Sequence, residues 1–134
     1  MKLDHIGIAT HRLADSMAVW RDALGLEIDS TEEVIDQGVR IAMLPLGDTH
    51  IELLEPLSAD SPVGKFLAKR GSGIHHLAVE VKDIRKTLSK LADQGIRLID
   101  REPRVGAGGC LVAFIHPSST NGVLLELVQR ASLV

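Results

Sequence analysis

Four side chains that can bind a metal ion occur at matching places in two halves of the sequence. His5 and His76 each lie near the start of an apolar segment, and Glu52 and Glu126 each interrupt a later apolar segment. His5 precedes Glu52 by 47 residues, and His76 precedes Glu126 by 50 residues. An ionised carboxylate in such a segment costs free energy unless it is paired or bound to a metal. Two imidazoles and two carboxylates suit Co²⁺, Mn²⁺, Ni²⁺, Fe²⁺ or Zn²⁺.

Each of these residues also has an ordinary structural explanation. A lone histidine in a strand is usually a hydrogen-bonded residue of the core or the edge, and a lone glutamate usually faces solvent. The equivalent positions of all four residues favour a shared site instead. His75 is the alternative to His76, because a shift of one residue in the strand register exchanges the two faces. We choose His76 because it aligns with His5 in the repeat.

An internal repeat supplies the elements that position these side chains. Each copy begins with a short apolar strand and continues with apolar residues at helical spacing. A glycine then stands where a left-handed residue would end the helix. His5 lies 20 residues before the glycine of the first copy, and His76 lies 19 before that of the second. The predicted helices and their terminal glycines are Leu13–Leu24 with Gly25 and Ile84–Gln94 with Gly95, the second with Asp83 as its N-cap.

Three strands follow each helix, so each copy is a βαβββ module. The predicted strands are Glu27–Glu33, Val39–Pro45 and His50–Leu54 in the first copy, and Arg97–Arg101, Leu111–His116 and Val123–Gln129 in the second. The modules extend over about residues 3–55 and 74–129, and a short helix is expected over Ser61–Lys69 between them. We therefore predict an α+β fold, with one domain over residues 1–134. Its curved mixed sheet would carry helices on the outer face and a site on the concave inner face.

Composition excludes several other classes of protein. The net charge of −3 and the 2% aromatic content give no support for nucleic-acid binding. No apolar run reaches the roughly 18 residues that a membrane span needs. The N-terminus lacks the layout of a secretory signal, so we expect a cytoplasmic protein. The single cysteine, Cys110, excludes an intramolecular disulfide and a cysteine-rich zinc site. Exposed sheet edges would favour a homodimer.

Several segments give the chain a family resemblance that runs from Leu3 to Gln129. With the paired modules and the four candidate ligands, it resembles the vicinal oxygen chelate, or glyoxalase, superfamily. Within that superfamily, it looks like the methylmalonyl-CoA epimerases. The segments that carry this second likeness are Asp4–Ala9, Ile51–Pro56, Asp60–Val63, Phe66–Leu67, Gly73–Ala78, Phe114–Pro117 and Gly122–Leu127.

The resemblance implies a divalent metal ion, with Co²⁺ as the first expectation, bound by His5, Glu52, His76 and Glu126. It also implies a CoA thioester substrate and interconversion of (R)- and (S)-methylmalonyl-CoA. Such a reaction removes the α-proton and passes through an enolate, which a metal ion stabilises. Two acid/base groups on opposite faces of the enolate are needed to invert the centre. Glu126 is one candidate, and by family analogy Asp36 is the other.

The sequence departs from the family pattern at two places. Asp36 stands where the family usually has glutamate, so its carboxylate reaches one methylene less far. Gly108 and Cys110 stand where the family commonly has histidine and lysine, which removes a polar group and a cation that could contact the substrate. Two other functions therefore stay open at this point. One is a glyoxalase-type lyase or isomerase, and the other is a metal-free small-molecule-binding module of the same fold.

Overall fold

The computed structural model describes residues 1–131, which fall into two compact units. The N-terminal unit consists of residues 5–75, and the C-terminal unit joins residues 1–4 to the segment that begins at His76. The strands β1 and β5 each begin in one unit and end in the other. The predicted single domain also includes residues 132–134, which lie outside the described residues.

The N-terminal unit has the predicted order of one strand, one helix and three strands, followed by a second helix. Its strands lie in the order β2-β3-β4-β1, with β1 parallel to β4 and the other neighbours antiparallel. Helix α1 continues directly into a π-helical segment, Ala18–Ala23. The elements are β1 (Lys2–Ala9), α1 (Leu13–Met17), β2 (Ser30–Val34), β3 (Val39–Leu46), β4 (Thr49–Pro56) and α2 (Pro62–Arg70).

The C-terminal unit repeats the order of strand, helix and three strands. Its strands lie in the order β5-β8-β7-β6, with β5 parallel to β8 and the other neighbours antiparallel. Short 3-10 turns precede and follow β7. The elements are β5 (Gly73–Glu80), α3 (Ile84–Asp93), β6 (Arg104–Val105), β7 (Leu111–Ile115) and β8 (Leu125–Gln129). Both units therefore contain one strand, one helix and three strands in this order.

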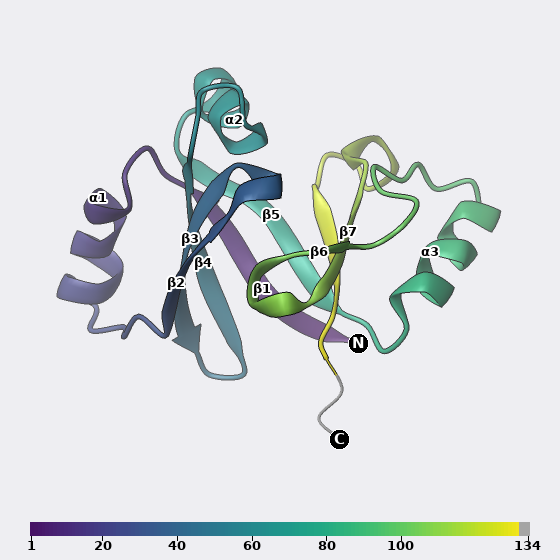
Figure 1. The fold of residues 1–134 in the computed structure, drawn as a ribbon, viewed down its shortest axis with the longest axis horizontal. Helices are drawn as coiled ribbons and strands as arrows, with labels where there is room; N and C mark the ends of the chain where they lie inside the picture. Colours follow the sequence, from purple (N-terminus) through teal and green to yellow (C-terminus); the bar gives the residue numbers. More distant parts are fainter. Residues whose placement is uncertain (132–134) are drawn as a thin grey trace. The chain divides into compact units, whose positions relative to one another are not determined.

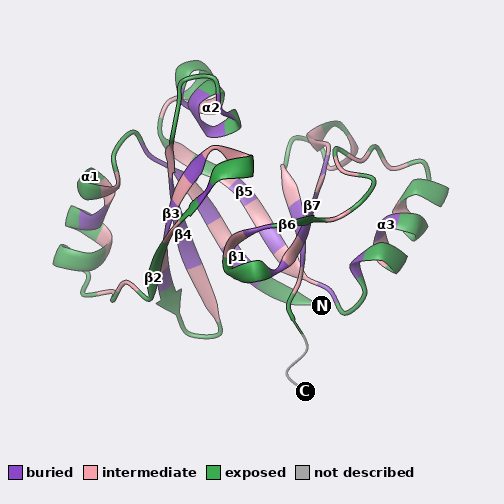
Figure 2. Cartoon of the chain, viewed as in Figure 1, coloured by how far each residue is buried: buried purple, intermediate pink, exposed green. Residues whose placement is uncertain are grey.

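In each unit, one helix packs on one face of the strands (Figure 1). Met17 of α1 lies in a buried cluster with Ile51 and Leu53 of β4. Ile84 of α3 lies in a cluster with Leu127 of β8. Figure 2 shows that these helices bury the side turned toward the strands and expose the other. Because side chains alternate along a strand, the residues between these apolar positions point to the opposite face, away from the helix.

The ends of the helices follow local rules. The carboxylate of Asp83 accepts a hydrogen bond of 3.1 Å from the Lys86 N–H, as predicted for an N-cap. The hydroxyl of Ser61 caps α2 in the same way, through the Gly64 N–H. Gly25 and Gly95 have φ angles of 82° and 78°, a left-handed geometry that glycine adopts without steric penalty.

The prediction of a strand over Arg97–Arg101 is wrong. That segment forms a single bridge, between Leu98 and Ile115, and β6 starts only at Arg104. The carboxylate of Asp100 accepts a hydrogen bond of 2.8 Å from the Phe114 N–H. In a regular antiparallel ladder, a backbone carbonyl oxygen of the neighbouring strand would accept this bond, so the side chain competes with strand pairing. Pro103, which has no N–H, then interrupts the segment again. The pattern of apolar and charged residues did not reveal this competition.

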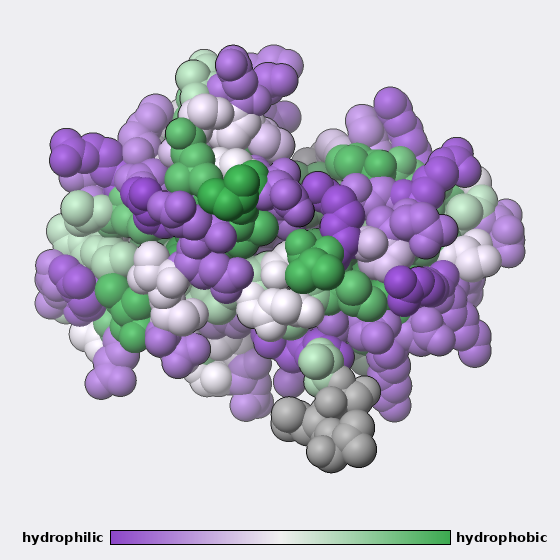
Figure 3. All heavy atoms as spheres, viewed as in Figure 1, coloured by the Kyte–Doolittle hydropathy of each residue, from purple (hydrophilic) through white to green (hydrophobic). Residues whose placement is uncertain are grey.

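Hydrophilic side chains cover most of the face drawn in Figure 3. None of the helices within residues 1–131 has the length and apolar character that crossing a membrane requires.

Candidate metal centre

The first candidate pair lies on β1 and β4 of the N-terminal unit. These strands run in parallel, and the register places His5 beside His50 and Gly7 beside Glu52. The His5 Nδ1 atom lies 3.3 Å from the Glu52 Oε2 atom. His5 is 3% exposed and Glu52 is 5% exposed, so both side chains are withdrawn from solvent. Glu52 lies on the face of β4 opposite to Ile51 and Leu53, which pack toward α1.

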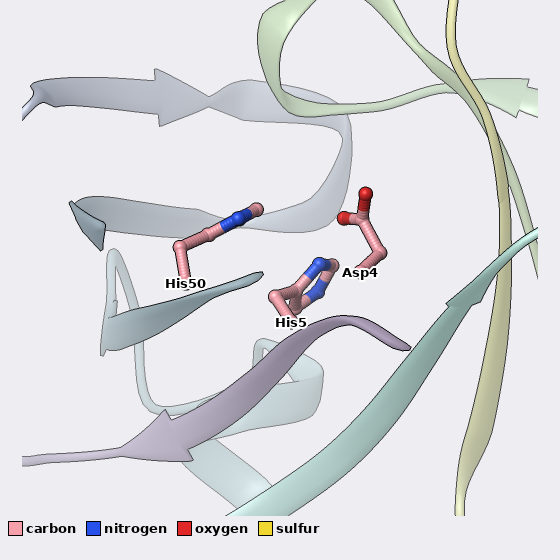
Figure 4. A group of neighbouring side chains, drawn as sticks. All are labelled: Asp4, His5 and His50. Carbon is pink, nitrogen blue, oxygen red and sulfur yellow. The ribbon is translucent and has the colours of Figure 1, made fainter. Parts of the chain in front are cut away.

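A third side chain, His50, belongs to the same cluster and was not identified from the sequence. Its Nε2 atom lies 3.0 Å from the Glu52 Oε2 atom. Its ring is stacked on that of His5, with a centroid distance of 5.0 Å and an interplanar angle of 29°. Figure 4 shows the His5 and His50 rings beside each other, and it also draws Asp4, which precedes His5 in the sequence. The available signal was the spacing of two between His50 and Glu52, which places both on one face of a strand.

The second candidate pair lies on β5 and β8 of the C-terminal unit. The His76 Nε2 atom lies 3.2 Å from the Glu126 Oε1 atom, and each residue is 5% exposed. The register places Glu126 beside Ala78 of β5 and Phe114 of β7. The Phe114 ring meets the His76 ring edge to face, with a centroid distance of 5.6 Å. Glu126 follows Leu125 and precedes Leu127, which pack toward α3, so its side chain lies on the other face.

The two pairs occupy equivalent places in the strand register, although His5 faces its glutamate through Nδ1 and His76 through Nε2. In each unit, the glutamate lies beside the residue two places after the histidine, which is Gly7 in one case and Ala78 in the other. A small residue at that position leaves room beside the carboxylate. Each pair combines one imidazole with one carboxylate at hydrogen-bonding or near hydrogen-bonding distance. The equivalence goes beyond the sequence repeat, because it includes the pairing of parallel strands.

The structure distinguishes the neighbouring histidines of β5. His76 is buried against Glu126, whereas His75 is half-buried and meets the Phe66 ring of α2 at a centroid distance of 4.9 Å. Successive residues of a strand point to opposite faces, so only one of the two can lie beside Glu126. His76, the residue chosen from the repeat, occupies that place.

Within the N-terminal unit, Asp36 lies apart from His5 and Glu52. It lies exposed in the 3-10 turn Ile35–Gln37, between β2 and β3. That turn ends at Gly38, whose φ of 64° permits the tight reversal. The turn adjoins the end of the ladder where Val39 pairs with Pro56, whereas Glu52 pairs with Met43 further along. An acid/base role for Asp36 stays a prediction.

The glycine-rich segment before β7 forms a 3-10 turn over Ala107–Gly109. The N–H groups of Gly106 and Gly109 are bonded within this segment, to the carbonyl oxygens of Cys110 and Gly106. Cys110 is buried in a cluster with Ala78, Val112 and Val128. The position that carries a lysine in the resembled family is therefore part of the core in this chain.

Comparison with known proteins identifies the family to which this chain belongs. Residues 4–114 match the model of the glyoxalase/bleomycin resistance protein/dioxygenase superfamily. The mitochondrial methylmalonyl-CoA epimerase of Dictyostelium discoideum is 40% identical, over 96% of this chain and 78% of that protein. The ethylmalonyl-CoA/methylmalonyl-CoA epimerase of Cereibacter sphaeroides is 40% identical, over 96% and 97%. A probable lactoylglutathione lyase from Synechocystis is 24% identical over 98% of each chain.

Solved structures agree with these sequence relatives. A methylmalonyl-CoA epimerase in complex with methylmalonyl-CoA and NH4+ matches with a TM-score of 0.92 and 42% identity. The match covers 98% of this chain and 95% of the other. A variant of the Streptomyces coelicolor methylmalonyl-CoA epimerase, in complex with 2-nitronate-propionyl-CoA, has a TM-score of 0.93 and 41% identity, with 99% and 96% covered. The predicted fold class, the α+β fold of the vicinal oxygen chelate proteins, is confirmed.

Proposed function

Because this chain belongs to the glyoxalase/bleomycin resistance protein/dioxygenase superfamily, we propose that it is a metal-dependent methylmalonyl-CoA epimerase. It would interconvert the (R) and (S) forms of a CoA thioester by removing and returning the proton at C2. The observation that carries the proposal is the pair of equivalent, buried histidine and glutamate side chains, His5 with Glu52 and His76 with Glu126. The choice of substrate is inferred from named epimerases that are about 40% identical over almost the whole chain.

The donor set fits a divalent metal ion. Burying a carboxylate is costly unless a cation or hydrogen bonds compensate it, and each glutamate here lies beside an imidazole rather than an arginine or lysine. Imidazole nitrogen and carboxylate oxygen are the ligands that borderline metals accept. We propose that His5, Glu52, His76 and Glu126 bind one such ion, with Co²⁺ ahead of Mn²⁺, Ni²⁺, Zn²⁺ and Fe²⁺. When bound, the ion would act as a Lewis acid toward the thioester and carboxylate oxygens of the substrate.

The proton at C2 needs protein groups on two faces of the substrate. In one direction, the Glu126 carboxylate would accept the proton, and the Asp36 carboxyl group would deliver one to the opposite face. In the other direction, the roles reverse, as microscopic reversibility requires. Asp36 lies in the exposed turn between β2 and β3, where its side chain can exchange protons with water. Glu126 is buried, so a proton on it is shielded from bulk water.

The direct test is exchange of the C2 hydrogen in D2O. Purified protein is incubated with methylmalonyl-CoA after metal removal, with and without added Co²⁺, and deuterium at C2 is followed by mass spectrometry. The proposal expects incorporation that depends on the metal and on both pairs. Absence of incorporation with Co²⁺, Mn²⁺, Ni²⁺, Zn²⁺ and Fe²⁺ in turn would refute the epimerase function.

The likeness to a lactoylglutathione lyase, at 24% identity, favours a glyoxalase-type isomerase as the second candidate. That reaction also proceeds through an enolate and uses a metal with a similar ligand set. Turnover of methylglyoxal with glutathione, and none with methylmalonyl-CoA, would replace the first proposal by this one. A metal-free binding module is the outcome if protein purified without chelator neither contains nor rebinds a divalent metal.

Assembly and location complete the proposal. Within residues 1–131, the end strands β2 and β6 each have one strand neighbour, so each leaves one edge available for pairing. We propose a homodimer in the cytoplasm, with no nucleic-acid or membrane partner. Light scattering coupled to size-exclusion chromatography measures the mass directly, and a mass near that of one 14.5 kDa chain would refute the dimer.

A further inference from the structure

We propose that His50 is a positioning residue that orients the Glu52 carboxylate for metal binding. This inference rests on the proposed function, because it concerns a ligand of the proposed metal ion. Its structural basis is a cluster of three side chains within the N-terminal unit, in which His5 and His50 both approach the Glu52 Oε2 atom. Neither the sequence repeat nor the four-ligand set includes His50.

The strand geometry brings His50 and Glu52 together. They are separated by one residue on β4, so their side chains emerge on the same face. The parallel pairing of β1 with β4 places His5 directly beside His50, and the two rings are stacked. The stacking favours one plane for the His50 ring, and in that plane its Nε2 atom lies 3.0 Å from the carboxylate oxygen.

The contact between His50 and Glu52 is a hydrogen bond with a defined direction. A carboxylate that binds a metal ion is ionised and can only accept, so the His50 tautomer that serves this role carries its proton on Nε2 and donates it to Oε2 over 3.0 Å. Charge-assisted bonds of this kind are stronger than bonds between neutral groups. The side chain of Glu52 is 7% exposed and that of His50 is 15% exposed, so the bond is partly shielded from water. Glutamate has three side-chain torsions, and this bond limits them before a metal binds.

Counting coordination positions separates this role from that of a fifth ligand. If the ion were six-coordinate, the four proposed ligands would leave two positions, which the two substrate oxygens would fill. A fifth protein ligand would leave one position and prevent chelation of the substrate. His50 therefore fits the role of a hydrogen-bond donor to a ligand, which metal sites commonly use to fix a carboxylate.

The histidine two residues before the glutamate occurs only in the N-terminal half of the sequence. The repeat aligns Glu52 with Glu126, so the counterpart of His50 is Leu124, which cannot donate a side-chain hydrogen bond. In the C-terminal unit, the strand neighbours of Glu126 are Ala78 and the aromatic Phe114. His50 is thus a feature that the duplication did not supply twice.

The experiment measures Co²⁺ binding to the full-length protein by its visible absorption, in the wild type and in three variants. His50→Leu removes the donor, and His50→Gln keeps an N–H close to the position of Nε2. His11→Leu is the matched control, because His11 is an exposed histidine of the same unit. We expect His50→Leu to weaken Co²⁺ binding at least about tenfold, while His50→Gln and His11→Leu stay within about threefold of the wild type. At saturating Co²⁺, the shape of the spectrum stays the same in all four proteins.

The outcomes separate this inference from the proposed function. Failure of the wild type to bind Co²⁺ overturns both. Wild-type binding with no loss in His50→Leu overturns the role of His50 alone. If the Co²⁺ spectrum at saturation changes in both His50 variants, His50 is itself a metal ligand. If His50→Gln loses as much Co²⁺ affinity as His50→Leu, the effect of His50 comes from packing. Either result overturns the positioning role. If His50→Leu does not fold, the comparison of His50→Gln with His11→Leu decides through affinity and spectrum.

Discussion

An ion pair with a buried carboxylate joins the first strand to the end of the last strand in the C-terminal unit. The Nε and Nη2 atoms of Arg130 lie 2.9 and 2.6 Å from the Asp4 Oδ1 atom. The side chain of Asp4 is 4% exposed and that of Arg130 is 47% exposed. Burial lowers the pKa of the Arg130 guanidinium, but the hydrogen bond and charge of Asp4, together with the charges of Cys110 and Glu80, raise the pKa above its ordinary value. Arg130→Met would leave the Asp4 carboxylate buried without this cation.

The size of the effect follows from the burial of the two partners. Removing one partner of a fully buried pair costs about 3–5 kcal/mol. Arg130 is half exposed, so water and salt already screen part of the interaction, and we expect a loss of about 2 kcal/mol. For a chain of this length that corresponds to a decrease of roughly 6 °C in melting temperature. Adding Asp4→Asn to Arg130→Met removes the buried charge and should recover about 1 kcal/mol.

Urea denaturation of the wild type, both single variants and the double variant measures these free energies. Arg85→Met is the matched control, since Arg85 is exposed on α3, and we expect a change within about 0.5 kcal/mol. Two results would refute the reasoning. One is an Arg130→Met variant no less stable than the control, and the other is a double variant no more stable than Arg130→Met alone.

Three further predictions concern packing and the proposed site. Gly64→Ala should lower the free energy of unfolding by about 1–3 kcal/mol, because an added Cβ atom would lie 2.7 Å from the Ala59 carbonyl oxygen. Thermal melting checks this prediction, and an unchanged melting midpoint contradicts it. His5→Ala and His76→Ala should each lose the bound metal and C2 exchange while circular dichroism stays native; retained metal in either excludes that ligand. Asp36→Asn should keep the metal but lose most of the C2 exchange, and normal exchange would show that another group is the acid/base.

The repeat made much of the site predictable. A duplicated module places equivalent residues in equivalent strands, so His5 and His76 could be aligned before any coordinates were known. Strand alternation then required Glu52 and Glu126 to face away from the apolar positions on either side of them. The structure places each histidine beside its glutamate, and metal binding by the four residues stays a prediction.

Other features could not be read from a repeat or a local pattern. His50 was missed because comparison of the two copies reveals shared positions, and its counterpart is Leu124. The strand predicted over Arg97–Arg101 failed because the Asp100 side chain competes with a backbone partner. The bond between Arg130 and Asp4 joins residues 126 positions apart, and no local signal specifies such a pair.

The measurement that tests the central claim most directly is a crystal structure of the Co²⁺-loaded protein with anomalous data at the cobalt edge. We predict one anomalous peak per chain, with a nitrogen of His5 and of His76 and an oxygen of Glu52 and of Glu126 at about 2.0–2.2 Å. A peak at another place, or separate peaks at the two histidine–glutamate pairs, would contradict the proposal that four residues share one ion.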